Sequence, residues 1–422
     1  MILEIRLSNF FSIKEEITLD MRAANINSKQ AKELSDNIFS YGKTNIIKTL
    51  ALYGANASGK SNIIKAIRFC ASMVINSHTH NENAIFNFMP FKFDGYPNKP
   101  SSFFISFVHN DIEYDYSFQL TRTEVIKESL FYYPKGRITK VFERDEKTGK
   151  TKKEKYTFGN QINRPFDVAE STSLKTLFIS RASQMDREIA KEVFAFFSQY
   201  FVLDLIFPDD AKIEHYFKNF KNELLTALQI ADSDISDLRI RKDVIPVTQV
   251  EFKKDDKNKR STNFSENMQE KVFISSYHKK DTKQPFEFFI EESAGTKKLL
   301  LVLLTILDVT KQNKTMLIDE LETNLHPYIV DFIIKLFHKS NKAQLIYATH
   351  NTNLLDLKKL RKDQIYFCNK KEDASTEVYS LYDYSDFRDT MDVEKAYLQG
   401  RFDAIPFMND SDENLEKLIH AK

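Results

Sequence analysis

Residues 54–61 read Gly54-Ala55-Asn56-Ala57-Ser58-Gly59-Lys60-Ser61, and this stretch decides the fold. It fits the pattern G-x-x-x-x-G-K-[ST], after the β-rich run Ile46–Tyr53 and before Ser61–Asn76, which has helical periodicity. The two glycines let the backbone curl so that its N–H groups point at phosphate oxygens. Lys60 is expected to reach the β- and γ-phosphates, and the Ser61 hydroxyl to bind Mg²⁺.

A plain glycine turn is the alternative to a phosphate-binding loop. The chain has only nine glycines, so a chance match to the whole pattern is improbable, and the pattern favours a nucleotide site. The residues expected to bind the nucleotide here are Gly54, Asn56, Ala57, Ser58, Gly59, Lys60, Ser61 and Asn62.

Two acids close the apolar run Thr315–Ile318. A phosphate-binding loop needs a carboxylate at such a strand end to hold Mg²⁺ through water, and Asp319 stands at that position. Glu320 is placed to activate the attacking water as a general base. Acids often close strands for structural reasons, so this interpretation depends on the apolar run and on the loop upstream.

A further apolar run, Gln344–Ala348, ends at Thr349-His350-Asn351. A histidine there can hydrogen-bond the γ-phosphate or the attacking water, whereas a lone histidine is more often structural. Because two other strand ends carry matched chemistry, His350 is interpreted as catalytic, together with Glu320 and Lys60. His326 stays open between lining an interface and starting the helix that Pro327 favours.

The stretch Glu292–Leu304 (ESAGTKKLLLVLL) begins with small residues and continues as a strongly apolar helix. Such a helix start has free backbone N–H groups and the positive end of the helix dipole, so it can hold an anion. The ordinary alternative is an N-cap in which Ser293 or Thr296 satisfies its own helix.

Composition indicates a globular protein of two or three lobes. The chain has 422 residues, 42% of them hydrophobic and 29% charged, with a formal charge of +1. This balance gives no global attraction to nucleic acid or membrane. Cys70 and Cys368 lie in apolar surroundings and are expected to be core thiols. No signal peptide is evident, and Leu299–Leu307 is too short to span a bilayer, so a cytoplasmic protein without a membrane part is expected.

Strict alternation of apolar residues over Ser102–Leu120 predicts an antiparallel hairpin, continued by Val125–Tyr133 and Ile138–Arg144. Helical spacing follows around residues 189–200 and 213–228, and two lysine-rich stretches, 147–155 and 253–260, are expected to be loop tips. The predicted domains are an ATPase core split between 1–90 and 285–422, an antiparallel β-subdomain at 91–160, and a helical lobe with returning strands and a basic loop at 161–284.

Four elements stand in order along the chain: GANASGKS, ESAGTKKLL, TMLIDELETNLHP and QLIYATHN. Together they resemble the ABC-type ATPase head of the SMC, Rad50 and RecF group. The N-terminal NFFS, the form of ESAGTKKLL, DELETNLHP, and the late stretches RKDQIYF and EKAYLQGRFDAIP look like the bacterial RloA/AbiL-type ATPases, which are similar to the OLD family. The resemblance covers most of the chain and is vague between 145 and 285.

The resemblance implies an α/β fold: a P-loop NTPase head with a mixed sheet flanked by helices, an antiparallel β-subdomain and a short helical lobe. It implies ATP and Mg²⁺ as ligands, and a homodimer that sandwiches nucleotide. Ser293, Gly295 and Thr296 would then meet the γ-phosphate bound by the other protomer, Asn324 to His326 would be the D-loop, and His350 the switch histidine. It also implies a Toprim-type nuclease partner in anti-phage abortive infection.

One departure from the family pattern is clear. ABC-type heads carry a Mg²⁺-contacting glutamine after the first antiparallel strands, but the nearest candidate stretch, Phe88–Lys92, has none. The chain also lacks the acidic cluster of a Toprim nuclease, so nuclease activity is not expected from it. The main function hypothesis is an ATP-driven switch. The alternatives are a DNA-binding clamp for repair, which would need a basic groove, and a transporter ATPase.

Overall fold

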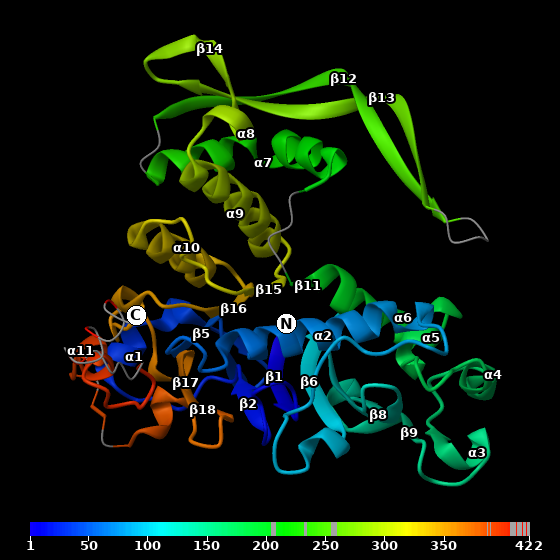
Figure 1. Cartoon of the computed structure of the whole chain (residues 1–422). Helices are drawn as coiled ribbons and strands as arrows, with labels where there is room; N and C mark the ends of the chain where they lie inside the picture. Colours follow the sequence, from blue (N-terminus) through cyan, green and yellow to red (C-terminus); the bar gives the residue numbers. More distant parts are fainter. Residues whose placement is uncertain are drawn as a thin grey trace. The chain divides into compact units, whose positions relative to one another are not determined.

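The computed structural model describes residues 1–203, 208–231, 234–254, 260–385, 387–388, 390–405, 411, 416 and 419, without the side chains of 249–254 and 260–266 (Figure 1). The chain forms two compact units, each described here by itself. The first unit contains Met1–Asp204, Val309–Thr323 and Ile333–Lys422, and the second contains Leu205–Asp308 and Asn324–Phe332.

A six-stranded mixed sheet lies at the centre of the first unit. Its strand order is β11 (Phe201–Val202), β15 (Thr315–Ile318), β16 (Gln344–Ala348), β5 (Thr49–Gly54), β17 (Ile365–Lys370) and β18 (Thr376–Ser380). All neighbouring pairs are parallel except β17 with β18. The residues of β5, β15 and β16 are buried throughout, as expected of parallel strands covered on both faces.

A seven-stranded antiparallel sheet forms the second layer of this unit. Its order is β10 (Tyr156–Phe158), β9 (Thr139–Asp145), β8 (Val125–Tyr132), β7 (Ile112–Leu120), β6 (Ser101–His109), β1 (Ile2–Ser8) and β2 (Ile17–Asp20). The alternation predicted over residues 102–120 is confirmed, because Phe103, Phe107, Tyr114 and Tyr116 are at most 2% exposed. The sheet also takes in β1 and β2 from the start of the chain.

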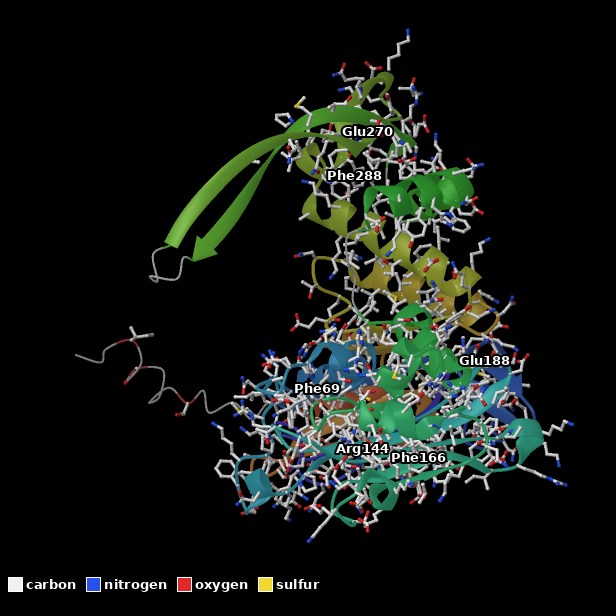
Figure 2. The ribbon with its side chains drawn as sticks, turned by 90° about the vertical axis from the view of Figure 1, so that its right-hand side faces the viewer. Phe69, Arg144, Phe166, Glu188, Glu270 and Phe288 are labelled. Atoms are coloured by element: carbon white, nitrogen blue, oxygen red, sulfur yellow. The ribbon has the colours of Figure 1, made fainter. Side chains whose placement is uncertain are left out.

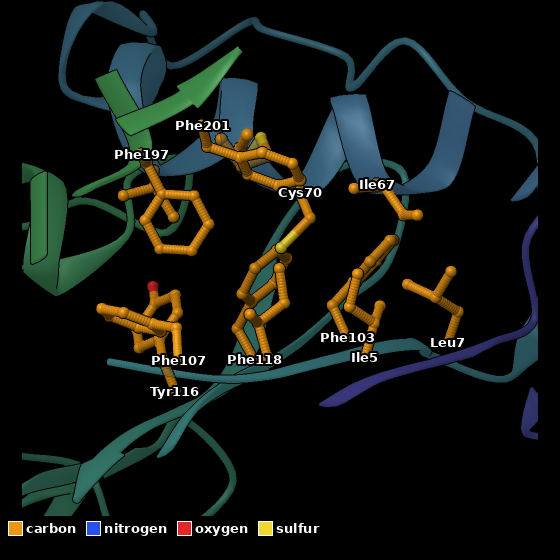
Figure 3. Close-up of a cluster of buried hydrophobic side chains, with 14 of the residues drawn as sticks. Ile5, Leu7, Ile67, Cys70, Phe103, Phe107, Tyr116, Phe118, Phe197 and Phe201 are labelled. Atoms are coloured by element: carbon orange, nitrogen blue, oxygen red, sulfur yellow. The ribbon is translucent and has the colours of Figure 1, made fainter. Parts of the chain in front are cut away.

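Helix α2 (Lys60–Asn76) packs its apolar side against the antiparallel sheet (Figure 3). Ile67 and Cys70 point from this helix toward Phe103 and Phe118 on the strands (Figure 3). The same cluster of buried side chains contains Leu317 and other residues of the mixed sheet. The helix that follows the predicted phosphate loop is therefore anchored in the main hydrophobic core.

The two sheets are also joined by one buried amide side chain. Gln344 is fully buried; its Oε1 accepts a hydrogen bond from the N–H of Ile2 at 2.7 Å, and its Nε2 donates to the Ile2 carbonyl at 2.9 Å. The Thr315 hydroxyl donates to the same Oε1 at 3.0 Å. This side chain thus satisfies the buried backbone N–H and carbonyl of Ile2 at the start of β1.

The run Ile46–Tyr53, predicted as one β-rich segment, contains parts of two strands. Residues up to Ile47 belong to β4 (Thr44–Ile47), which pairs with β3 (Ile38–Tyr41), and the chain then enters β5. The break falls at Lys48, whose Nζ donates to the carbonyl oxygens of His338 and Ser340 at 2.8 and 2.6 Å. The buried Lys48 ammonium, whose hydrogen bonds go to these carbonyls, thus lies where the chain passes from the β3–β4 pair into the six-stranded sheet.

A buried carboxylate links the antiparallel sheet to the helices beside it. Glu128 on β8 accepts hydrogen bonds from the N–H groups of Phe178 and Ile179 at 2.6 and 3.0 Å, and from the Tyr116 hydroxyl at 2.9 Å. Arg144 on β9 lies 3.6 Å from it, and both side chains have no solvent exposure. Figure 2 labels Arg144 in this unit. Glu128 thereby fixes the start of α5 (Phe178–Gln184).

The remaining helices of the first unit are short: α1 (Lys29–Glu33), α3 (Lys152–Lys155), α4 (Pro165–Glu170), α6 (Glu188–Ala195) and α11 (Val393–Leu398). Helix α3 occupies part of the lysine-rich stretch 147–155, expected to be a loop tip. Its lysines make local contacts, since Lys152 Nζ donates to the Thr172 carbonyl at 2.8 Å and Lys155 lies 3.0 Å from Glu146.

The second unit combines helices with a three-stranded antiparallel sheet. Its elements are α7 (Asp210–Ile230), β12 (Ile235–Lys254), β13 (Arg260–His278), β14 (Asp281–Glu287) and α8 (Phe288–Glu291), with the beginnings of α9 (Ala294–Lys311) and α10 (Pro327–Lys339). The basic stretch 253–260 lies largely outside the described residues. The domain boundaries drawn from the sequence stay a prediction. Every helix that the structure describes is too short or too polar to cross a bilayer.

Candidate nucleotide-binding site

The loop 54–61 leaves β5 and enters α2, as its sequence predicts, and the space around both glycines is fully used. A Cβ atom on Gly54 would collide with the Cys368 carbonyl and the Ser58 hydroxyl. Gly59 has a φ of +107°, and a Cβ there would collide with Thr376. Gly54 is therefore required because neighbouring atoms approach its backbone closely. Gly59 is required for the same reason and also because its backbone has a left-handed conformation.

Lys60 folds back over its own loop. Its Nζ donates to the carbonyl oxygens of Gly54 at 2.8 Å and Ala55 at 3.0 Å, and the residue is 6% exposed. Burial holds the pKa of Lys60 below its usual value. The ammonium thus sits at the mouth of the loop, where a phosphate could replace the two carbonyls as its partner.

Two residues far away in sequence hold the loop in this shape. The Thr376 hydroxyl donates to the Ser58 carbonyl at 2.9 Å and lies 2.7 Å from the Ser12 hydroxyl. Ser12 Oγ accepts in turn from the Asn62 side chain at 2.7 Å. The sequence analysis missed Ser12 and Thr376. The stretch NFFS, which contains Ser12, was noted only as part of the family resemblance, and Thr376 stands in no motif.

Because β5, β15 and β16 are parallel neighbours, the loops after them meet at one edge of the sheet. Asp319 follows β15, and its Oδ1 is buried without a hydrogen-bond partner among the described residues. The Ser58 hydroxyl is buried and unpartnered in the same sense. Glu320 is exposed, and Ser61 is half-buried at the start of α2.

His350 follows β16 at this edge and is exposed, with its backbone N–H donating to Glu322 Oε1 at 2.5 Å. Partial desolvation of the ring by its neighbours and the ammonium of Lys60 hold the pKa of His350 below its usual value, while Glu322, Glu320 and Asp319 oppose that shift. The imidazole is therefore neutral at pH 7 and can accept as well as donate a hydrogen bond. The structure brings Lys60, Asp319, Glu320 and His350 into one electrostatic neighbourhood.

Ser293, Gly295 and Thr296 belong to the second unit. The Ser293 hydroxyl accepts from the N–H of Thr296 at 3.1 Å, so the ordinary N-cap considered for this helix is present. A Cβ on Gly295 would lie 3.2 Å from the Asn324 carbonyl oxygen. A side chain at this position would therefore require that carbonyl to move by a few tenths of an ångström. Ser293 and Ala294 are exposed, so the start of α9 is open to solvent in the chain alone.

His326 stands at the beginning of α10, which starts at Pro327. Its Nδ1 accepts from the N–H of Tyr328 at 3.3 Å, and its carbonyl accepts from Ile329 at 2.8 Å. These hydrogen bonds are those of a residue that starts a helix, which was one of the two roles considered for His326; the other was lining an interface. Asn324, two residues earlier, has a φ of +59°.

The first-unit residues fit ATP and Mg²⁺. A hard cation prefers oxygen ligands, and the edge of the sheet presents the unpartnered carboxylate oxygen of Asp319 with the hydroxyl of Ser61 in the loop. In the part of the chain that the structure describes, Lys60 Nζ donates to the carbonyls of Gly54 and Ala55 in its own loop. Ser293, Gly295 and Thr296 belong to the second unit and not to the sheet of the first.

The solved structures that this chain is similar to include two SMC heads. One is described as "Crystal structure of the SmcHead bound to the C-winged helix domain of ScpA", with 15% identity, 94% of this chain and 99% of that chain covered, and a TM-score of 0.45. The other is the SMC head domain from Thermotoga maritima, with 13% identity, 90% and 98% covered, and a TM-score of 0.38.

No curated protein matches the sequence at a significant level. A family described as "AAA domain, putative AbiEii toxin, Type IV TA system" matches residues 49–356, which include the loop at 54–61, Ser293–Thr296, the two acids after β15 and His350. These residues are well over half of the chain, so the chain belongs to this family of AAA-domain proteins.

Proposed function

We propose that this chain is a Mg²⁺-dependent ATP hydrolase that works as a dimerising nucleotide switch. The observation that carries the proposal is the buried, unpartnered carboxylate oxygen of Asp319, at the sheet edge that also holds Lys60. An orphaned charged oxygen costs free energy in the free protein, and a cation with its phosphate ligand would satisfy it.

The residues divide the work by chemistry. Backbone N–H groups of residues 54–61 and the Lys60 ammonium bind the phosphates, and Ser61 with Asp319 holds the metal. Bound Mg²⁺ supplies charge neutralisation for the phosphate oxygens. Glu320 accepts the proton of the attacking water, and His350, neutral at pH 7, hydrogen-bonds that water or the γ-phosphate.

The switch would need two chains. The start of α9 is exposed in the single chain, and Ser293, Gly295 and Thr296 would complete the nucleotide site of a second copy. A homodimer in which each chain gives one half of two sites is closed by ATP and opened by hydrolysis. In this arrangement the nucleotide controls which surfaces the dimer shows to a partner.

The biological role proposed is anti-phage abortive infection, in the cytoplasm, with a Toprim-type nuclease as the effector. The family description names a putative toxin of a toxin–antitoxin system, which supports a role in arresting growth under the control of a partner. The resemblance to RloA/AbiL-type ATPases supports the same role. The membership of this chain in that narrower group is part of the proposal.

A DNA-repair clamp is the alternative from the sequence, and the pairing of three cations on β12 does not favour it. Arg239, Arg241 and Lys242 on β12 each lie within 2.8 Å of a carboxylate, of Asp237, Asp243 and Glu214 respectively. Cations that are already paired are poorer partners for the phosphates of a nucleic acid.

The test is ATP hydrolysis and binding by the purified chain with Mg²⁺. Lys60→Ala should lose most nucleotide binding. Glu320→Gln should bind ATP but turn over at least about a hundredfold more slowly, because it keeps the shape of the side chain and loses the base. Wild-type turnover in Glu320→Gln would remove Glu320 from its assigned role, and binding by Lys60→Ala equal to wild type would refute the site.

A further inference from the structure

Glu322, which stands in the stretch DELETNLHP but was given no role from the sequence, joins the loop after β15 to the loop after β16. Its Oε1 accepts the backbone N–H of His350 at 2.5 Å, and its Oε2 accepts the Thr349 hydroxyl at 2.7 Å. One carboxylate thus takes hydrogen bonds from two successive residues of the switch loop, defined here as Thr349–Thr352. Bonds to an ionised acceptor are about twice as strong as neutral ones.

The backbone before Glu322 explains why its side chain lies against this loop. Glu320 has a φ of +52°, which turns the chain sharply after the strand. Leu321 is fully buried and its N–H lies 3.4 Å from the Ala348 carbonyl at the end of β16. With Leu321 anchored there, the half-buried Glu322 is carried to the switch loop.

The hydrogen bonds continue beyond the carboxylate. Thr349 is fully buried, and its hydroxyl, while donating to Glu322, accepts from the N–H of Asn351 at 3.0 Å. Glu322 therefore holds the Thr349 side chain and the backbone amide of His350 directly, and the amide of Asn351 through the Thr349 hydroxyl.

We propose that Glu322 is a positioning residue that holds the switch loop against the loop of Asp319 and Glu320. It thereby keeps the distance between His350 and the Glu320 carboxylate constant. This inference rests on the proposed ATPase function. A displacement of about 1 Å in such a group can cost up to about a hundredfold in rate, although the displaced residue does not itself touch the substrate.

Three variants separate this role from general loosening of the loop. Glu322→Ala removes both acceptors. Glu322→Gln keeps the shape, with an amide oxygen for the N–H of His350 and an amide nitrogen that can donate to the Thr349 hydroxyl. Glu394→Gln is the matched control, because Glu394 accepts from the Thr352 hydroxyl at 2.6 Å, in the same loop but on the far side of His350.

The experiment has two arms, of which the first uses no nucleotide. Amide hydrogen exchange over residues 349–351 should accelerate in Glu322→Ala and stay close to wild type in Glu322→Gln and Glu394→Gln. In steady-state ATP hydrolysis, Glu322→Ala should lose at least about tenfold in kcat with KM changed less than about twofold. Glu322→Gln should recover most of that loss, and Glu394→Gln should match wild type.

Each contrary result has a distinct meaning. Unchanged exchange or unchanged kcat in Glu322→Ala overturns the clamp, and so does a rise in KM at constant kcat, which would make Glu322 a binding residue. Equal losses of kcat in Glu322→Ala and Glu394→Gln would reduce the effect to loop loosening and also overturn it. A wild-type chain without ATP hydrolysis would instead overturn the proposed function, and with it the catalytic purpose of the clamp.

Discussion

Replacing Gly59 with alanine tests how strictly the fold constrains the phosphate loop. The backbone there has a φ of +107°, where an L-residue costs about 1–3 kcal/mol. The added methyl group would lie 2.8 Å from Cγ2 and 2.9 Å from Cβ of Thr376, and closer still to its hydroxyl. No rotation of Thr376 relieves an overlap that includes its Cβ, so the strand or the loop must move.

That movement breaks the bonds that the Thr376 hydroxyl makes to the Ser58 carbonyl and the Ser12 hydroxyl, at 2.9 and 2.7 Å. Each is worth about 0.5–1.5 kcal/mol. With the backbone strain, Gly59→Ala should lower the free energy of unfolding by about 2 to 6 kcal/mol. It should also abolish ATP binding, because the loop can no longer present its N–H groups together.

A double-mutant cycle separates the two terms. Thr376→Gly alone loses the hydrogen bonds, whereas Gly59→Ala with Thr376→Gly removes the overlap and keeps the backbone strain. The double variant should be more stable than the sum of the single effects by about 1–3 kcal/mol, the value of the two bonds that both single variants lose. Urea unfolding followed by far-UV circular dichroism gives the free energies. Additive effects, or a Gly59→Ala protein that unfolds and binds ATP like wild type, would refute the reasoning.

The remaining predictions concern the core and the assembly. Glu128→Gln should destabilise the chain by about 1–3 kcal/mol in urea unfolding, because an amide nitrogen replaces one of the two oxygens that accept the buried N–H groups of Phe178 and Ile179. Glu143→Gln, in a half-exposed pair on the next strand, should change little. Cys368 should resist a thiol reagent at pH 8 until urea unfolds the chain, since burial raises its pKa to about 12 and keeps the thiol protonated. Gly295→Arg should spare folding and ATP binding but abolish hydrolysis, and mixing it with Lys60→Ala should restore activity in heterodimers; a fully active Gly295→Arg monomer would end the trans arrangement.

The sequence predicted the parts of the fold that local patterns determine. The loop 54–61, the helix after it, the aromatic hairpin and the strand-ending acids are each written in fewer than twenty consecutive residues. That Asp319 and His350 lie at one sheet edge was not predicted and follows from the parallel pairing of β15 and β16. The residue roles at that edge stay a proposal, supported by the burial and pairing described above.

The parts that the sequence did not reveal depend on long-range contacts. Thr376 supports Ser58 from 318 residues away, and Glu322 holds His350 across a whole helix and strand. Neither residue type is unusual at its position, so no local signal marks them. The two long strands β12 and β13 were also missed as such, because charged residues and Pro246 interrupt their apolar pattern.

The distribution of backbone strain gives an independent argument for where this chain acts. Among the described residues other than glycine, asparagine and aspartate, a left-handed φ occurs at Phe11, Ala57, Lys135, Arg164, Glu320 and Ala374. Ala57 and Glu320 are predicted site residues, Phe11 precedes Ser12, and Ala374 lies two residues before Thr376. Such conformations cost about 1–3 kcal/mol each and persist only where surrounding structure enforces them. At Glu320 a glycine would relieve the strain, so a strained glutamate there supports the general-base role proposed for its carboxylate.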